Sequence, residues 1–227
     1  MNITLFGTCR LNKINHNNLN NLINYSHSTK EVIQFIQFLK GELIIPYPYN
    51  NLCFRTAICN NTYINYDDYF NKLFMETDVF IIEICSNKKY IHNFYLHHLS
   101  VDLRFNFTQH TPQDILDNYI IEKQSDEEIE NDILEIQKML YPKKCIIVSH
   151  YNSKQNGQVI PARNHLIQLL DTICKKHNIP FINPTTVLNY TQEEVMQDDL
   201  GHYTELGLNE IMNYINSYLQ MNKIESI

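Results

Sequence analysis

Two short segments, far apart in the chain, carry side chains that could perform nucleophilic chemistry. Gly7–Arg10 follows an apolar run and contains Cys9, and Asp199–His202 lies shortly before the last helical pattern. Gly7 permits a sharp turn and a close approach of the backbone at this point. If a helix begins after Cys9, its first N–H groups would lower the pKa of the thiol and could donate to an oxyanion. The alternative reading of Cys9 is a small apolar residue beneath a turn.

His202 is the histidine whose spacing from a carboxylate suits the general base of an acyl transfer. In a D-x-x-H step on a loop that enters a helix, Asp199 can hold one ring nitrogen while the other faces a nucleophile. Asp198 is a rival for the role of the carboxylate. The same pattern also fits an ordinary polar loop, because Asp and His both favour loops.

The composition excludes several classes of protein. A net charge of −7 over 227 residues argues against a nucleic-acid partner, because a surface that follows phosphates needs clustered Lys and Arg. No apolar run approaches the ~18 residues of a membrane span, and the first residues lack the features of a signal peptide. The six cysteines are scattered and include no C-x-x-C pair. We therefore expect a cytoplasmic protein without a metal finger.

Alternating strand and helix patterns predict the fold that would bring the two segments together. Nearly continuous apolar runs are typical of strands buried on both faces of a parallel sheet. Such runs predict strands at Ile3–Phe6, Val79–Ile84, Cys145–Ser149 and Pro180–Ile182, with a weaker fifth at Cys53–Ile58. Helical spacing predicts helices at Thr29–Lys40, Asp126–Leu140, Ile160–His177 and Thr204–Leu219. We expect an α/β fold, a three-layer α/β/α sandwich around a mostly parallel five-stranded sheet.

The chain shows no internal repeat and no linker, so a single domain spanning residues 1–227 is expected. The stretch 90–124 fits the alternating pattern poorly. We interpret it as an insertion with a helix from Thr111.

In an open parallel sheet, ligands bind outside the carboxyl ends of the strands. Arg10 follows the first predicted strand, Ser86 and Asn87 follow the Val79–Ile84 strand, and His150 follows the next. These residues are candidates to line a substrate pocket, although a packing role for His150 is equally open. Some of the basic residues at or near strand ends are also candidates to bind an anionic group such as a coenzyme A phosphate, although ordinary surface charge is the default interpretation of each: Arg10, Arg55, Lys88 and Arg163.

Four further histidines lie in the poorly patterned stretch, at positions 92, 97, 98 and 110. No H-E-x-x-H motif or carboxylate spacing accompanies them, and such patterns are what mark a zinc site in a sequence. The sequence therefore predicts no metal site.

The order of these landmarks resembles the SGNH/GDSL hydrolase superfamily. The resemblance rests on a G-x-[S/C] turn after the first strand, polar residues after the third, and D-x-x-H before the last helix. Gly7-Thr8-Cys9 is similar to the branches with cysteine in the serine position, which include GSCFA-type proteins and WcbI-like capsule-polysaccharide acetyltransferases. The resemblance spans the chain from Ile3 to the final helix and implies an SGNH-like fold with flavodoxin-like strand order.

Carried over position by position, the resemblance makes Cys9 the nucleophile, His202 the base and Asp199 its orienting partner. It makes Asn87 the counterpart of the asparagine that donates to the oxyanion, together with the N–H of Cys9. Ser86 is an almost equal candidate for that role.

Two features depart from the family pattern. The glycine expected after the second strand is missing, because no Gly occurs between Gly41 and Gly157, and the serine is a cysteine. A cysteine readily forms a thioester from a thioester donor, which favours acyl transfer. We expect no bound cofactor, with acetyl-CoA as a candidate acyl donor.

These residues predict an enzyme that transfers an acetyl or other acyl group on a carbohydrate hydroxyl through a Cys9 thioester. The alternatives are an SGNH-type esterase or deacetylase that acts on glycans and an inactive glycan-binding module. A cysteine protease is disfavoured by the strand order and by D-x-x-H. The identity of donor and acceptor and the oligomeric state are left open.

Overall fold

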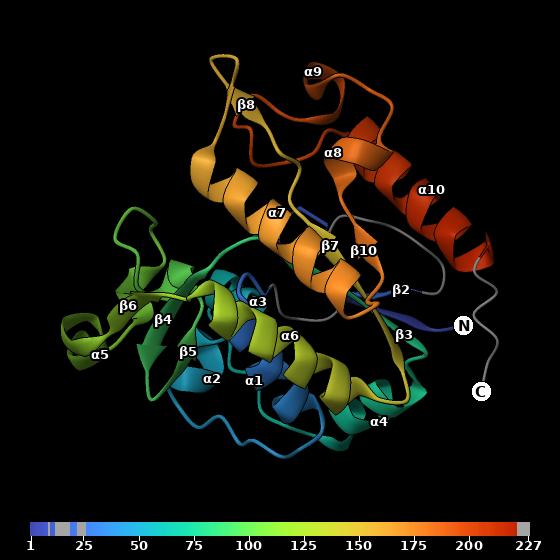
Figure 1. Ribbon diagram of the computed structural model, residues 1–227. Coiled ribbons are helices and arrows are strands. Elements are labelled where there is room, and N and C mark those ends of the chain that lie inside the picture. Colours follow the sequence, from blue (N-terminus) through green and yellow to red (C-terminus); the bar gives the residue numbers. More distant parts are fainter. Residues whose placement is uncertain (9, 12–18, 22–25, 222–227) are drawn as a thin grey trace.

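Five parallel strands form the central sheet in the computed structural model, which describes residues 1–8, 10–11, 19–21 and 26–221 (Figure 1). The order across the sheet is β10-β7-β3-β1-β2, so the first strand in the chain lies inside the sheet, as in flavodoxin-like folds. Their bounds are Ile3–Phe6 (β1), Leu19–Asn21 (β2), Val79–Ile84 (β3), Lys144–Ser149 (β7) and Phe181–Ile182 (β10). The predicted fold class is confirmed.

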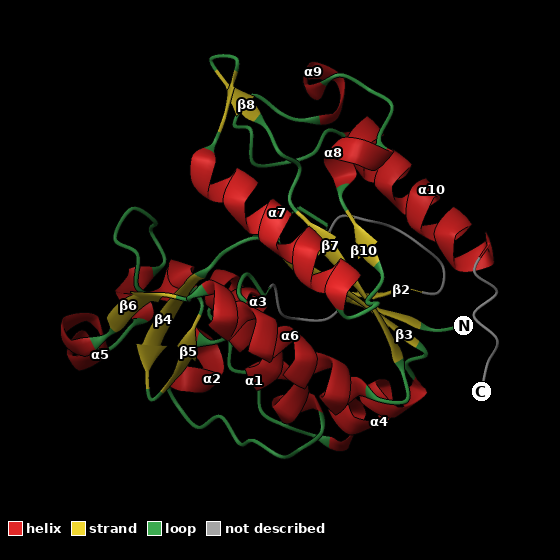
Figure 2. Cartoon of the chain, viewed as in Figure 1, coloured by secondary structure: helices red, strands yellow, loops and turns green. Residues whose placement is uncertain are grey.

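Helices cover both faces of this sheet, which gives three layers (Figure 2). One face carries Phe6, Phe80 and Ile82 and packs against α1 (Thr29–Leu39), α4 (Asp68–Glu76), α6 (Asp126–Leu140) and α7 (Pro161–Lys176). The other face carries Leu5, Ile81 and Val148 and packs against α10 (Glu205–Met221). The short helices α8 (Pro184–Val187) and α9 (Gln192–Val195) lie in the connection to α10.

The four long predicted helices are present, and local chemistry fixes their ends. Ser28 accepts a hydrogen bond from the N–H of Glu31, whose carboxylate accepts one from the N–H of Ser28, which is a capping box at the start of α1. Gly41 follows the last turn of this helix with φ +72°, a conformation that costs glycine little.

The predicted strand at Cys53–Ile58 is wrong, because this segment is helical. It follows α2 (Tyr49–Leu52) directly and runs into α3 (Arg55–Asn60). Phe54, Ala57 and Ile58 are buried at i, i+3 and i+4, the spacing of one helix face. The fifth strand is instead β2, at the edge of the sheet beside β1.

The stretch that fits the alternating pattern poorly forms a small antiparallel sheet beside the central one (Figure 1). Its strands are β4 (Lys88–His92), β5 (Phe94–Leu96) and β6 (Ile120–Lys123). Between β5 and β6 the chain forms the 3₁₀ turns His98–Ser100 and Thr108–His110 and the helix α5, whose bounds are Gln113–Asn118. A hairpin of β8 (Lys154–Gln155) and β9 (Gln158–Val159) precedes α7.

Candidate active site

Asp199 and His202 lie in a tight loop before α10. Oδ1 of Asp199 accepts hydrogen bonds from the N–H groups of Gly201, at 2.8 Å, and of His202, at 2.9 Å. Its other carboxylate oxygen, Oδ2, contacts Nδ1 of the His202 ring. Although burial raises the pKa of Asp199, the hydrogen bonds from the His202 ring and the two N–H groups lower it to about 2. Asp199 is therefore an anion at neutral pH, placed to fix the orientation of the ring.

The neighbouring carboxylate, Asp198, is exposed and pairs with none of the residues that the structure describes. Of the two carboxylates that the sequence offered as partners for His202, the structure places Asp199 on the ring.

Arg163, on the first turn of α7, holds this loop from the other side. Its Nη1 donates to the carbonyl oxygen of Leu200 at 2.8 Å, and the hydroxyl of Ser153 donates to the same oxygen at 3.2 Å. Leu200 has φ +55°, a conformation that costs a residue with a Cβ roughly 1–2 kcal/mol. The guanidinium of Arg163, which the sequence offered as an anion site, here contacts the main chain that positions His202.

A buried carboxylate supports the segment that leads into Cys9. Oε2 of Glu83 accepts hydrogen bonds from the N–H of Thr8, at 2.9 Å, and from its hydroxyl, at 2.5 Å. Burial raises the pKa of Glu83, while Arg10, Thr8 and His202 act to lower it. Thr8 Oγ1 in turn accepts from the N–H and from Nη1 of Arg10.

Gly7 is required here for close packing. A Cβ at this position would lie 3.1 Å from side-chain carbons of both Leu5 and Leu11. Such a contact is tighter than ordinary van der Waals packing, so a larger residue would displace its neighbours. Cys9 itself lies outside the described residues. The structure therefore describes its neighbours Thr8 and Arg10 but gives no geometry for the thiol.

A cavity of about 400 Å³ opens at the carboxyl ends of β1 and β3. Arg10, Cys85, Ser86 and His202 line it from the central sheet and the D-x-x-H loop. Residues of the small antiparallel sheet and of the segment after it also line the cavity: Lys88, Tyr90, His98, Leu99 and Phe105. His202 and the segment after β1 thus share one cavity, at the edge where the sequence predicted a site.

Two of the predicted pocket residues do not line this cavity. Asn87 lies next to Ser86, and its carbonyl oxygen accepts a hydrogen bond from the N–H of Gln124 at 2.7 Å. His150 is buried, and neither of its ring nitrogens has a hydrogen-bond partner among the described residues. Burial lowers the pKa of His150 well below its usual range, so its ring is neutral. Their roles in binding remain predictions, as do those of the other site residues.

The cysteines differ in their surroundings. Burial raises the pKa of Cys145 to about 11 and that of Cys174 to about 12, so neither is a ready nucleophile at neutral pH. Cys85 is partly exposed and lines the cavity. It is the described thiol that a reagent in the cavity would meet.

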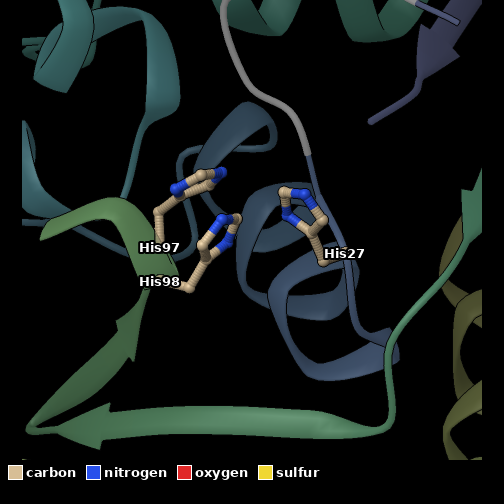
Figure 3. A group of neighbouring side chains, drawn as sticks. All are labelled: His27, His97 and His98. Carbon is tan, nitrogen blue, oxygen red and sulfur yellow. The ribbon is translucent and has the colours of Figure 1, made fainter. Parts of the chain in front are cut away.

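The side chains of three histidines lie close together (Figure 3). Two of them, His27 and His98, line the cavity, whereas His97 is buried. His97 and His98 follow β5, and their rings stack with centroids 4.5 Å apart. His27 precedes α1, and its ring lies edge-on to both, with centroids at 4.8 Å and 4.6 Å. The carbonyl oxygen of His27 accepts hydrogen bonds from the N–H groups of Cys85 and Ser86, which ties its segment to the end of β3. Sequence reasoning missed this cluster because 70 positions separate His27 from His97.

The sheet and the cavity define an α/β protein with a candidate active site at the carboxyl edge of its parallel strands. The chain belongs to the TviD N-terminal domain family, whose model matches residues 1–100 and 94–217. It is 27% identical over 217 residues to the Vi polysaccharide biosynthesis protein TviD of Salmonella typhi. That alignment covers 78% of this chain and 25% of the relative, so the chain spans about a quarter of the length of TviD.

Solved structures with a similar course of the chain include three enzymes. An aryl esterase of M. smegmatis has a TM-score of 0.43 and 10% identity, with 97% of this chain and 98% of that chain covered. LAE5, an alpha/beta hydrolase from the metagenome of Lake Arreo, has a TM-score of 0.44 and 15% identity, with 100% of this chain and 96% of that chain covered. The acetyl-xylooligosaccharide esterase Axe2 of Geobacillus has a TM-score of 0.41 and 12% identity, with 96% of this chain and 92% of that chain covered. Likenesses this distant say nothing about the chemistry of this chain.

No helix among the described residues is both long and apolar enough to cross a membrane.

Proposed function

We propose that this protein transfers an acyl group, such as acetyl, to a carbohydrate hydroxyl through a thioester on Cys9. The observation that carries the proposal is the Asp199–His202 pair, because His202 lines the cavity together with Arg10, the residue after Cys9. The relative's part in polysaccharide biosynthesis supports a carbohydrate acceptor. The strand order, with the segment of Cys9 after β1 and D-x-x-H before α10, supports a place in the SGNH superfamily. The cysteine at position 9 is the reason to propose its cysteine branch.

In the first step, Nε2 of His202 removes the proton from the Cys9 thiol, and the sulfur attacks the carbonyl carbon of the acyl donor. A carbon–sulfur bond forms, and the bond from that carbon to the leaving group breaks. The imidazolium then gives its proton to the leaving group. Asp199, ionised beside Nδ1, stabilises the imidazolium and keeps the ring in the required orientation.

In the second step, His202 removes the proton of a sugar hydroxyl, and the oxygen attacks the thioester carbon. An oxygen ester forms, the carbon–sulfur bond breaks, and the proton returns to the Cys9 sulfur. Arg10 and Arg55 line the cavity and add positive charge, which favours the thiolate and the oxyanions that form in both steps. With water in place of the sugar, the same steps hydrolyse the donor.

The proposal is tested by trapping the acyl-enzyme. The protein is incubated with acetyl-CoA or p-nitrophenyl acetate, and the acetylated cysteine is located by peptide mass spectrometry. We expect acetyl on Cys9, none in Cys9→Ala, and slow acylation in His202→Ala. Cys85→Ala is the matched control, because Cys85 is a described cavity thiol outside the proposed mechanism.

Adding sugars to the isolated acyl-enzyme distinguishes an acyltransferase from an esterase. Release of acetyl that depends on a sugar supports transfer, whereas equal release into plain buffer indicates an esterase. Acetyl on Cys85 alone would show that the nucleophile is wrong. A folded protein that acquires no acetyl group from either donor would favour the glycan-binding module.

A further inference from the structure

The three imidazole rings of the cluster come from two segments that the fold brings together (Figure 3). Each of His27, His97 and His98 offers one ring nitrogen within 4.8 Å of those of the other two. We propose that these three residues bind a divalent transition-metal ion of the zinc type.

The ring arrangement is close to that of a three-histidine site. Zinc–nitrogen bonds of about 2.0–2.1 Å in a tetrahedral site place the ligating nitrogens about 3.4 Å apart. The nitrogens of the cluster need to approach one another by little more than 1 Å, which side-chain rotations can supply. His27 and His98 both line the cavity, so an ion held by the cluster would keep its fourth position open to the cavity.

The protonation state of the cluster also suits a metal, because imidazole binds metals in its neutral form. Burial, with help from neighbouring His27, His98 and Arg55, lowers the pKa of His97 well below its usual range. Burial likewise lowers the pKa of His98 to about 4. Both rings are therefore neutral at neutral pH, the form of imidazole that binds a metal.

One ring atom in the cluster is unsatisfied. Nε2 of His97 is buried and has no hydrogen-bond partner among the described residues, and such an atom costs about 1–3 kcal/mol. Coordination would remove this cost. It would also place the ring proton on Nδ1, at the expense of the 3.3 Å hydrogen bond that Nδ1 accepts from the N–H of Leu99.

The surroundings restrict which cation can bind. Arg10, Arg55 and Lys88 line the same cavity and repel cations, whereas Glu31 is the carboxylate among its lining residues. A hard cation such as Mg²⁺ prefers oxygen ligands and gains little from imidazole. Bonds between imidazole and a zinc-type ion are what can offset the repulsion.

The test is a titration of the metal-free protein with Co²⁺, which replaces zinc and gives a visible absorption band in tetrahedral sites. We expect the band to saturate at one equivalent per chain and to disappear when Zn²⁺ is added, while Mg²⁺ has no effect. His27→Asn and His98→Asn should abolish the band. His97→Asn should do the same, and its side chain can still cap the turn at His98–Ser100. His110→Asn, on an exposed histidine that is not part of the cluster, should leave the band unchanged.

Circular dichroism and melting temperature identify the variants that fold, and at least one folded cluster variant that lacks the band is required. The absence of a saturable band in the wild-type protein would overturn the proposal. So would a band that persists in folded His27→Asn and His98→Asn. A sulfur-to-metal absorption that is lost in Cys9→Ser or Cys85→Ser would assign the ion to a thiol and overturn the proposal as well. The readout needs no acyl transfer, so it is independent of the proposed function.

Discussion

Replacing Arg163 by Met tests whether the D-x-x-H loop is held in place from α7. The methionine keeps most of the apolar length of the side chain but cannot donate to the carbonyl oxygen of Leu200. Leu200 would then keep its positive φ with the hydroxyl of Ser153 as the remaining side-chain donor to that oxygen. We expect the loop to leave this conformation for part of the time and to carry His202 away from the cavity.

The magnitude follows from the contacts. A hydrogen bond from a charged donor contributes about 1.5–3 kcal/mol, and the bond from Ser153 retains part of the stabilisation. A net loss of about 2 kcal/mol corresponds to roughly a 30-fold change in the equilibrium that orders the loop. Turnover, and the rate at which iodoacetamide alkylates Cys9, should fall by about 10- to 30-fold, because a displaced imidazole cannot take the thiol proton.

The assay separates positioning from substrate binding. Arg163 does not line the cavity, so we expect kcat to fall while KM changes little. Only Nη1 of Arg163 donates to the loop, so Arg163→Lys should recover most of the rate. Arg104→Met, which removes an exposed arginine paired with Asp102, is the matched control and should be silent. A normal kcat and alkylation rate in a folded Arg163→Met would refute this account, and so would a raised KM with unchanged kcat.

Three further predictions concern the supports of the site. Asp199→Asn should lower turnover by roughly 10²–10⁴-fold with little change in melting temperature, whereas Asp198→Asn should change neither. The reverse result would show that Asp198, not Asp199, is the carboxylate that acts with His202. Because burial raises the pKa of Glu83 above 4.5, its contribution to stability is complete below pH 4.5 and is lost as pH rises through the raised value. In Glu83→Gln the melting temperature should therefore fall less as pH rises than it does in the wild-type protein. The same dependence of melting temperature on pH in both proteins would contradict a raised pKa for Glu83. In Gly207→Ala the new Cβ would lie 2.4 Å from the carbonyl oxygen of Val195, so we expect the free energy of unfolding, measured by chemical denaturation, to fall by about 1–3 kcal/mol. An unchanged free energy would show that α9 and α10 can move apart at no cost.

The central strands could be predicted from the sequence because they are buried on both faces. All of β1 and β3, and β7 after Lys144, are buried, so these strands have no solvent-exposed face that would require alternating polar residues. The same reasoning failed at Cys53–Ile58, since a short apolar run looks alike in a buried helix and in a buried strand. It also missed β2, where a three-residue edge strand contains two asparagines.

The candidate site divides in the same way between local and distant contacts. Asp199 and His202 are three positions apart, so their spacing alone predicted that they could meet. The contact of Arg163 with Leu200 joins residues 37 positions apart, and the histidine cluster joins residues about 70 apart. Neither spacing has a local pattern, so only the fold reveals these contacts.

Glu83 lies between these two cases, because the sequence did carry a signal for it. It is the charged residue within the apolar strand Val79–Ile84, and a carboxylate buried on a central strand needs hydrogen-bond donors from a neighbouring strand. The parallel register pairs Phe6 with Ile82, so the chain that leaves β1 passes beside Glu83, and Thr8 supplies both donors. A carboxylate near the end of a buried strand therefore predicts that the segment leaving the neighbouring strand supplies its hydrogen-bond donors. Here the donors come from Thr8, the residue before Cys9.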